Sequence, residues 1–288
     1  MGNKKRILIL GGTGMLGHTL FNEFSAHDNL DVYATARKSD GLSRWFSAEL
    51  IKKIYSGVDA DNFDTVIRAL AAIQPDVVIN CIGLIKQLPM ASDPLSAITV
   101  NSQLPHRIAL ICSASRARMI HISTDCVFDG SKGNYTEDDP PNPTDLYGRS
   151  KLLGEVNYPH CVTLRTSIIG HELKGKLGLM EWFLAQEGHV HGFMKAIYSG
   201  FPTIELARII NQYVLPNPDL HGIYHVASQP ISKYELLKLI AERYNKQIVI
   251  EPYSEFFIDR SLNSSIFNKT TGYKAPSWPE LIEKMYKN

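Results

Sequence analysis

Tyr147 and Lys151, in the run YGRSK, are two residues whose types and spacing could do chemistry. Residues four apart lie on one face of a helix, so the phenol and the amine could reach the same small volume. A free phenol has a pKa of about 10, and a neighbouring ammonium group favours the phenolate and lowers that pKa. Such a tyrosine can exchange a proton with a carbonyl oxygen near neutral pH. An isolated Y-x-x-x-K is more commonly a surface pair at a helix start, so the rest of the chain must decide.

Strands and helices alternate along the N-terminal half. β-branched runs predict strands at residues 6–10, 31–36, 76–83, 117–124 and 161–167. Helical periodicity appears at residues 15–27, 62–73 and 96–115, and the amphipathic stretch 45–55 predicts a further covering helix. This alternation is typical of an α/β fold with a Rossmann-type, doubly wound parallel sheet.

The composition changes past about residue 168, where His, Gly, Pro and aromatic residues become more frequent. We therefore expect a Rossmann domain over residues 1–168, to which some later segments return. Residues 169–288 should form a smaller C-terminal α/β lobe that binds the substrate and includes a helix at 232–245.

The turn LILGGTGMLGH carries three glycines at three-residue steps after the first strand: Gly11, Gly14 and Gly17. Small residues there let the backbone approach a pyrophosphate, which a helix N-terminus then binds through free N–H groups. We expect Thr13, Met15 and Leu16 to contact the same cofactor. The alternative is a tight strand-to-helix turn without a ligand.

The second strand ends in TARKSD, with Arg37 and Lys38 where NAD-binding proteins usually carry a carboxylate. A guanidinium group matches phosphate geometry, so the sequence favours NADP(H), although two solvated surface cations would look the same. We expect a third strand before SGVDADN, followed by Asp59 and Ala60 at the adenine edge, and the cofactor ribose should pass Cys81, Ile82 and Gly83 at the end of the fourth strand, 76–83.

The run STDCVFDG ends another strand at the carboxyl edge of the sheet, where open α/β folds bind ligands. Thr124 could hold the oxygen that Tyr147 protonates, with Lys151 lowering the phenol pKa. Asn101 could support Lys151 through a backbone or water link, or it could be an ordinary polar helix residue.

The chain at this point resembles the extended short-chain dehydrogenase/reductases, and most of all their dTDP-4-dehydrorhamnose reductase branch. The resemblance runs nearly end to end and is carried, in family order, by the glycine turn and by PDVVIN, STDCVFDG, YGRSKLLGE, LRTSIIG, GFPTIELA, GIYHVAS and DRSLNSS. It implies an NADPH-dependent reductase of a nucleotide-linked 4-keto-6-deoxy sugar, as used in deoxysugar and surface polysaccharide biosynthesis. The catalytic residues implied are Thr124, Tyr147 and Lys151, and the substrate residues implied are Asp125, Pro202, Thr203 and Arg260.

Two positions depart from the family pattern. Cys126 stands where an aromatic residue usually follows STD, and Ile168 stands where Trp usually follows RTS. Both positions should face the sugar, so their change predicts the same chemistry on a different sugar. A nucleophilic role for Cys126 finds no convincing base partner in the sequence.

Other functions remain open. An epimerase or dehydratase of the same superfamily would keep the fold, but dehydratases typically add a Glu where this chain has Cys126. A non-catalytic regulatory subunit is a second alternative, because this branch also resembles a protein that serves a methionine adenosyltransferase. Such a subunit need not keep a working Tyr–Lys pair, and this chain keeps both residues.

The overall composition limits the partners. A formal net charge of +1 without a basic run argues against a nucleic-acid partner. A membrane-spanning helix needs an apolar run of about eighteen residues, and no run in the sequence is that long. Four cysteines without metal-type spacing fit a reducing cytoplasm. His189 and His191 lack a clear third ligand, so we expect no metal. The sequence leaves a homodimer open.

Overall fold

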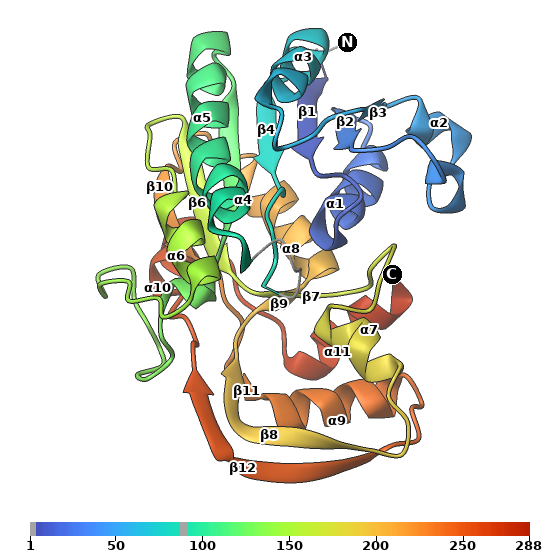
Figure 1. Ribbon diagram of the computed structural model, residues 1–288, viewed down its shortest axis with the longest axis vertical. Helices are drawn as coiled ribbons and strands as arrows, with labels where there is room; N and C mark the ends of the chain where they lie inside the picture. Colours follow the sequence, from blue (N-terminus) through green and yellow to red (C-terminus); the bar gives the residue numbers. More distant parts are fainter. Residues whose placement is uncertain (1–3, 87–91) are drawn as a thin grey trace. The chain divides into compact units, whose positions relative to one another are not determined.

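The computed structural model describes residues 4–86 and 92–288, and the chain divides into two compact units (Figure 1). Unit 1 comprises Met1–Ser123, Asp145–Leu164 and Asn217–Ile223. Unit 2 comprises Thr124–Thr144, Arg165–Pro216 and Tyr224–Asn288. The chain thus enters each unit more than once, and the division of labour between a cofactor domain and a substrate lobe stays a prediction.

A seven-stranded sheet forms the centre of the α/β architecture, in the order β10-β6-β5-β4-β1-β2-β3. Its strands are β1 (Lys5–Leu10), β2 (Leu30–Ala36), β3 (Ile54–Ser56), β4 (Val77–Asn80), β5 (Arg118–Thr124), β6 (Cys161–Thr166) and β10 (Gly222–His225). The pairs β1–β2, β1–β4, β2–β3 and β4–β5 are parallel. The Rossmann-type fold is confirmed, and the chain order reverses between β1 and β4, where such sheets bind ligands.

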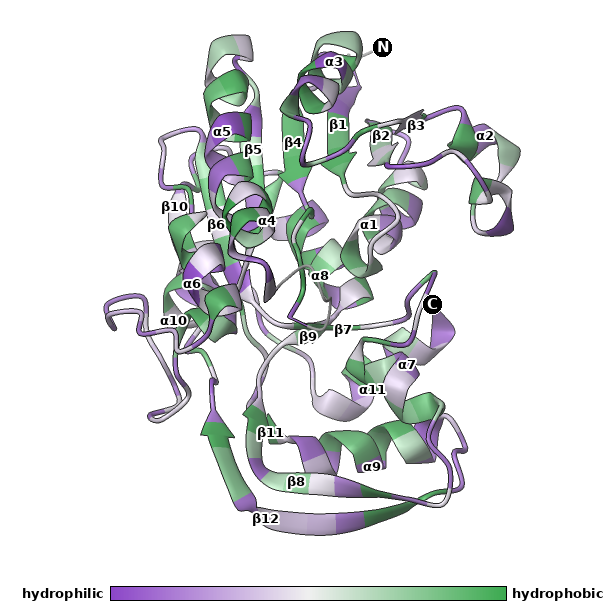
Figure 2. Cartoon of the chain, in the orientation of Figure 1, coloured by the Kyte–Doolittle hydropathy of each residue, from purple (hydrophilic) through white to green (hydrophobic). Residues whose placement is uncertain are grey.

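The central strands are buried on both faces. Ile7, Leu8, Ile9 and Leu10 of β1 have no exposed surface, as expected for a parallel strand covered by helices on both sides. Figure 2 shows the matching hydrophobic colouring along β4. The helices of this unit are α1 (Met15–Ser25), α2 (Ala48–Ile51), α3 (Phe63–Ile73), α4 (Pro94–Ala97), α5 (Leu104–Ser115) and α6 (Leu146–Leu153).

The prediction of a covering helix over residues 45–55 is wrong for most of its length. Only α2 is α-helical there, and Ile54–Ser56 forms β3, which pairs in parallel with Ala34–Ala36 of β2. Backbone groups of β2 need hydrogen-bond partners, and this demand outweighs the local amphipathic pattern. The strand expected at 76–83 is also shorter and ends at Asn80.

The helical stretch expected at 96–115 contains a change of helix type. A π-helical segment, Ile98–Gln103, joins α4 to α5 and contains the buried Asn101. Such π-bulges are rare and occur frequently at functional sites.

Unit 2 has two small sheets and five α-helices among its described residues. The sheets are β7 (Ile168–Ile169) with β9 (Phe201–Pro202), and β11 (Ile231–Ser232), β8 (His189–Tyr198) and β12 (Val249–Asp259) in the order β11-β8-β12. The helices are α7 (Leu179–Leu184), α8 (Thr203–Ile209), α9 (Lys233–Arg243), α10 (Ser265–Thr271) and α11 (Trp278–Lys287). None of the helices described in either unit combines the length and apolarity that crossing a membrane requires.

Candidate functional site

The glycine turn after β1 uses its glycines for different purposes. Gly11 has φ +84°, a left-handed conformation that glycine adopts readily, and its N–H donates to Thr35 Oγ1 at 3.0 Å. A Cβ on Gly17 would collide with the carbonyl oxygen of Gly11, so Gly17 allows α1 to pack closely against the turn. A Cβ on Gly14 would meet only that same oxygen, at an ordinary 3.4 Å. Packing therefore explains Gly11 and Gly17 but not Gly14.

The N-terminus of α1 is suited to an anion. Gly14 is its N-cap and offers no side-chain cap, and the first turn contains no acidic residue. The first N–H groups of a helix lack partners within the helix, and the helix dipole favours negative charge there. Thr13 and Met15 are partly exposed beside the exposed Gly14, whereas Leu16 is buried. Among the described residues other than its chain neighbours, no side-chain atom lies within 4 Å of a Cβ placed on Gly14, which leaves space there for a pyrophosphate.

The end of β2 presents two exposed cations. Arg37 and Lys38 are exposed and form no hydrogen bond or ion pair with the described residues. The loop after β3 lies beside them, because Val58 N donates to the carbonyl oxygen of Ala36 at 3.1 Å. In that loop, Thr65 Oγ1 holds both the backbone N–H and the carbonyl oxygen of Asp59, and Ala60 is buried.

The end of β4 lies against the glycine turn. A Cβ on Gly11 would lie 3.1 Å from Ile82 Cγ1 and 3.4 Å from the carbonyl carbon of Cys81. One residue further on, a Cβ on Gly83 would lie 3.8 Å from Lys151 Nζ. The fold of unit 1 therefore brings together the predicted glycine turn, the predicted ribose segment and the predicted catalytic lysine.

Lys151 is buried at this junction, with 5% of its surface exposed. Its Nζ donates to the carbonyl oxygen of Ile122 at 2.7 Å. Burial lowers the pKa of Lys151 to about 8, against the attraction of Glu155 and Cys81. Tyr147 is half-buried one turn earlier on the same face of α6, whose first turn Asp145 caps by accepting from Gly148 N at 2.8 Å.

Asn101 connects the end of β4 to α6. Its Oδ1 accepts from Leu84 N at 2.8 Å, and its Nδ2 donates to Leu84 O and Ser150 Oγ, both at 3.1 Å. Ser150 Oγ in turn donates to the carbonyl oxygen of Tyr147 at 2.9 Å. Asn101 therefore links Leu84, which follows the predicted ribose segment, to Ser150, which precedes Lys151 on α6; a link from Asn101 to Lys151 stays a prediction.

The sequence analysis missed two residues of this site. Thr35 looked like an ordinary strand residue, although a polar side chain late in an apolar strand was the available signal. Ser150 lies inside YGRSK, but its hydroxyl accepts a hydrogen bond from Asn101, which is 49 residues away in the sequence, so the sequence alone does not show this contact.

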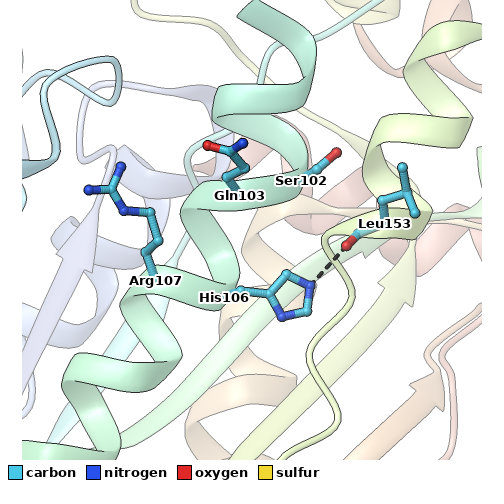
Figure 3. A pocket seen from close by; sticks show the side chains of 5 residues that line it. All are labelled: Ser102, Gln103, His106, Arg107 and Leu153. Carbon is cyan, nitrogen blue, oxygen red and sulfur yellow. Dashed lines mark hydrogen bonds between the residues drawn. The ribbon is translucent and has the colours of Figure 1, made fainter. Parts of the chain in front are cut away.

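A shallow pocket with a volume of about 330 Å³ lies elsewhere on unit 1 (Figure 3). It is lined by Ser102, Gln103, His106, Arg107 and Leu153, and His106 Nε2 lies 2.9 Å from the carbonyl oxygen of Leu153. None of these residues belongs to the predicted catalytic or cofactor set.

Thr124, Asp125, Cys126 and Arg260 come together in unit 2. Thr124 Oγ1 donates to Asp125 Oδ1 at 3.2 Å, and Arg260 Nη1 lies 3.6 Å from Cys126 Sγ. Arg260 Nε also donates to the carbonyl oxygen of Phe128 at 2.8 Å. Burial, with the Asp125 carboxyl adding to it, raises the pKa of Cys126 to about 12, so this thiol is a poor nucleophile at neutral pH.

Ile168, Pro202 and Thr203 form a second group in unit 2. β7 and β9 pair in parallel with Ile168 opposite Phe201 and Ile169 opposite Pro202. A Cβ on Gly170 would come within 2.5 Å of Thr203 Oγ1, so Thr203 lies directly against this short sheet. Thr124 and Tyr147 belong to different units, and their joint action on one substrate atom stays a prediction.

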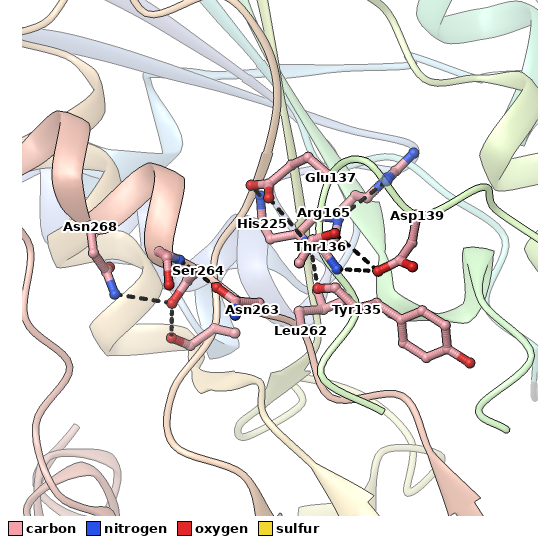
Figure 4. A network of polar contacts seen from close by, with 12 residues as sticks. Tyr135, Thr136, Glu137, Asp139, Arg165, His225, Leu262, Asn263, Ser264 and Asn268 are labelled. Carbon is pink, nitrogen blue, oxygen red and sulfur yellow. Dashed lines mark hydrogen bonds and ion pairs between the residues drawn. The ribbon is translucent and has the colours of Figure 1, made fainter. Parts of the chain in front are cut away.

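A buried polar network holds the segment that follows Thr124 (Figure 4). His225 N donates to Glu137 Oε1 at 2.8 Å, and its Nδ1 lies 2.9 Å from the carbonyl oxygen of Tyr135. Arg165 Nη1 donates to His225 Nε2 at 3.2 Å, so Nδ1 carries the proton and the imidazole is neutral. Burial, with Arg165 adding to it, lowers the pKa of His225 to about 4 and keeps the ring neutral.

Comparisons with known proteins agree with this architecture. The family model described as RmlD substrate binding domain matches residues 5–288. Methionine adenosyltransferase 2 subunit beta of Danio rerio is 28% identical over 254 residues, covering 84% of this chain and 74% of that protein. A dTDP-4-dehydrorhamnose reductase of Aggregatibacter actinomycetemcomitans is 27% identical over 257 residues, covering 85% and 81%.

Among solved structures, a dTDP-4-dehydrorhamnose reductase from Bacillus anthracis in complex with NADP has the same fold. Its TM-score is 0.81 at 23% sequence identity, and the match covers 100% of this chain and 99% of that one. The family model spans nearly the whole chain, and the resemblance carried by the sequence motifs is confirmed. This chain therefore belongs to the RmlD substrate binding domain family, within the dTDP-4-dehydrorhamnose reductase-like branch of the extended short-chain dehydrogenase/reductases.

Proposed function

We propose that this protein is an NADPH-dependent reductase of a nucleotide-linked 4-keto-6-deoxy sugar, acting in deoxysugar or polysaccharide biosynthesis. The observation that carries the proposal is the proximity of the predicted ribose segment to the predicted catalytic lysine: a Cβ placed on Gly83 would lie 3.8 Å from Lys151 Nζ. The presence of Tyr147 one turn away on α6 adds the acid that carbonyl reduction requires.

NADP(H) is the cofactor that the residues fit best. Gly14 leaves room for a pyrophosphate at the start of α1, and Arg37 can pair with a 2′-phosphate at the end of β2. The similar Bacillus anthracis reductase was solved in complex with NADP, which supports the same assignment. Adenine would lie near Asp59 and Ala60, and the nicotinamide ribose near Cys81, Ile82 and Gly83.

The bound nicotinamide would supply the hydride that reduces the keto carbon. Tyr147 donates a proton to the ketone oxygen as that carbon is reduced, and Thr124 donates a hydrogen bond to the same oxygen. The Lys151 ammonium group stabilises the phenolate that Tyr147 leaves behind, because a neighbouring charge of opposite sign lowers the pKa of a phenol. A backbone carbonyl, Ile122 O, keeps the Lys151 amine pointing into the site.

The sugar would lie against Asp125, Cys126, Ile168, Pro202, Thr203 and Arg260 in the substrate-binding part of the chain. Replacement of two expected aromatic residues by Cys126 and Ile168 removes stacking surface, each ring contributing about 1 kcal/mol beyond its buried area. We therefore propose a sugar different from 4-dehydrorhamnose, carried on UDP, GDP or dTDP by a cytoplasmic enzyme.

A second candidate function is supported by the relative from Danio rerio. Its name describes a subunit of a methionine adenosyltransferase. Its sequence is 28% identical to this chain, and that of the bacterial reductase is 27% identical. The second candidate is therefore an NADP-binding regulatory subunit that does not turn over a sugar.

The test is NADPH oxidation, followed by the loss of its absorbance, across UDP-, dTDP- and GDP-linked 4-keto-6-deoxy sugars. Turnover of one donor supports the reductase and identifies the nucleotide. Tight NADPH binding without turnover, together with a changed activity of an added methionine adenosyltransferase catalytic subunit, supports the regulatory function instead.

A further inference from the structure

His121 is a buried histidine near the end of β5 that the proposed reaction does not use, and it has no exposed surface. In the register of the central sheet it lies opposite Asn80, the last residue of β4, which is also fully buried. The row before it on the same face is apolar, with Val78 opposite Met119 in the hydrophobic core. The apolar face of the sheet therefore ends in a polar pair at the carboxyl edge, where open α/β sheets bind ligands.

The hydrogen bonds of Asn80 fix the orientation of its amide and the tautomer of His121. A backbone N–H can only donate, so the Asn80 atom 3.1 Å from Ile82 N is the oxygen, Oδ1. The amide nitrogen of Asn80 therefore faces His121 and donates to Nδ1 at 3.2 Å. Because Nδ1 accepts this bond, the neutral ring carries its proton on Nε2.

The surroundings keep the His121 ring neutral, as this arrangement requires. Burial, with Lys151 and His106 adding to it, lowers the pKa of His121 well below its ordinary value. A protonated Nδ1 could not accept from the Asn80 amide. The neutral ring is therefore the form that holds Asn80 in the orientation seen.

This chain of hydrogen bonds ends on the predicted ribose segment. Asn80 holds Ile82 N, and Asn101 Oδ1 accepts from Leu84 N, two residues further on, at 2.8 Å. Gly83, the residue that approaches the catalytic lysine, lies between these two amides. The backbone that should meet the nicotinamide ribose is therefore fixed on both sides.

The His121 ring is poorly suited to a purely stabilising role. Among the described residues, its Nε2 has no hydrogen-bond partner. An unsatisfied buried donor opposes folding, and an apolar side chain of similar volume would avoid that cost. A buried polar group that opposes folding and holds a ligand-binding edge fits a functional role better than a structural one.

We propose that His121 is a positioning residue for the nicotinamide ribose: its ring orients Asn80, and Asn80 holds the backbone that the ribose contacts. The inference rests on the proposed NADP(H) site. Without the ring, the Asn80 amide is free to turn away from Ile82 N, and cofactor binding must then order this backbone itself. The loss should be confined to the nicotinamide half of the cofactor, because the predicted 2′-phosphate and adenine contacts, Arg37 and Asp59, follow other strands.

The test compares the affinity for NADPH with that for adenosine 2′,5′-bisphosphate, which keeps the adenine half of the cofactor and lacks the nicotinamide ribose. We expect His121→Leu to weaken NADPH binding about fivefold, the effect of losing one hydrogen bond. The affinity for the bisphosphate should stay unchanged. The melting temperature should not fall, because leucine fills a similar volume and carries no unsatisfied donor.

His121→Asn should give the opposite pattern. The asparagine Oδ1 can take the place of Nδ1 and accept from Asn80, so the NADPH affinity should stay near that of the wild type. The shorter side chain leaves a cavity, so the melting temperature should fall. Met119→Leu, two residues earlier on the same face of β5, is the control and should change neither affinity.

Two results would overturn the inference and leave the proposed function standing. One is equal NADPH affinity of the wild type and His121→Leu. The other is an equal loss of affinity for NADPH and for the bisphosphate, which a general disturbance of the sheet would produce. A wild-type protein that does not bind NADPH would overturn the proposed cofactor site itself, and the inference with it.

Discussion

The Lys151 amine donates a hydrogen bond to the carbonyl oxygen of Ile122 at 2.7 Å, although only 5% of the lysine is exposed. One carbonyl does not replace the water that a charged amine gives up, so burial lowers the pKa of Lys151 to about 8 from its ordinary 10.5. A group this costly to bury at the carboxyl edge of the sheet fits a functional role better than a structural one.

Replacing this amine should stabilise the protein and inactivate it. The unfolded chain binds the Lys151 proton more tightly than the folded chain does, so the charged amine opposes folding at neutral pH. We expect Lys151→Met to raise the free energy of unfolding at pH 7 by up to about 3 kcal/mol, while turnover is lost. Chemical denaturation of both proteins measures the change.

The gain should depend on pH. In the wild type, the destabilisation caused by burying the charged Lys151 amine decreases as the pH rises through about 8, and it is absent at a pH above 10.5. The stability gain from Lys151→Met should therefore shrink at high pH. Lys38→Met, at an exposed position, is the control and should change stability little at either pH. A Lys151→Met protein that is less stable than wild type at pH 7 would contradict this account of the site.

Tyr147→Phe should remove the proton donor and leave the cofactor site intact. A positioned general acid contributes at least about a hundredfold to rate, so turnover should fall by that factor while the Kd for NADPH changes little. Tyr286→Phe, on the exposed side of α11, should have neither effect. A Tyr147→Phe enzyme that keeps more than about a tenth of the activity would exclude the proposed acid role.

Gly14 and Gly17 should respond differently to an added methyl group. Gly14 has φ −79°, and its added Cβ would meet only Gly11 O, at an ordinary 3.4 Å, so Gly14→Ala should fold normally but bind NADPH more weakly, because the Cβ would occupy the pyrophosphate position. Gly17→Ala drives its Cβ into Gly11 O, so it should lower the melting temperature. Thermal unfolding and NADPH titration of both variants separate the two roles. Equal NADPH affinity of wild type and Gly14→Ala would count against the proposed position.

Arg37→Ala should change cofactor preference. Loss of a charge-assisted hydrogen bond to a phosphate costs about 1.5–3 kcal/mol, so the Kd for NADPH should rise at least about tenfold while that for NADH stays nearly constant. Arg68→Ala, exposed on α3, is the matched control. If the affinities for NADPH and NADH fall equally, Arg37 does not read the 2′-phosphate.

Local patterns were good guides where burial and periodicity act together. The β-branched runs 6–10 and 31–36 became β1 and β2 within one residue, because strands buried on both faces must be continuously apolar. The amphipathic run 45–55 wrongly predicted a helix, because its last residues form β3 and pair with the edge of β2. Backbone pairing with a distant strand cannot be read from the periodicity of one segment.

The sequence by itself determined the chemistry available to this protein. The glycine spacing, the cations after β2 and the Tyr147–Lys151 pair are all visible as local patterns, because each lies within one turn or one helix. Only the tertiary structure decided which of them meet. The approach of Gly83 to Lys151 and the bonds from Asn101 to Leu84 and Ser150 join segments far apart in the chain. Strand order and helix crossovers set these contacts, and those depend on the packing of the whole sheet.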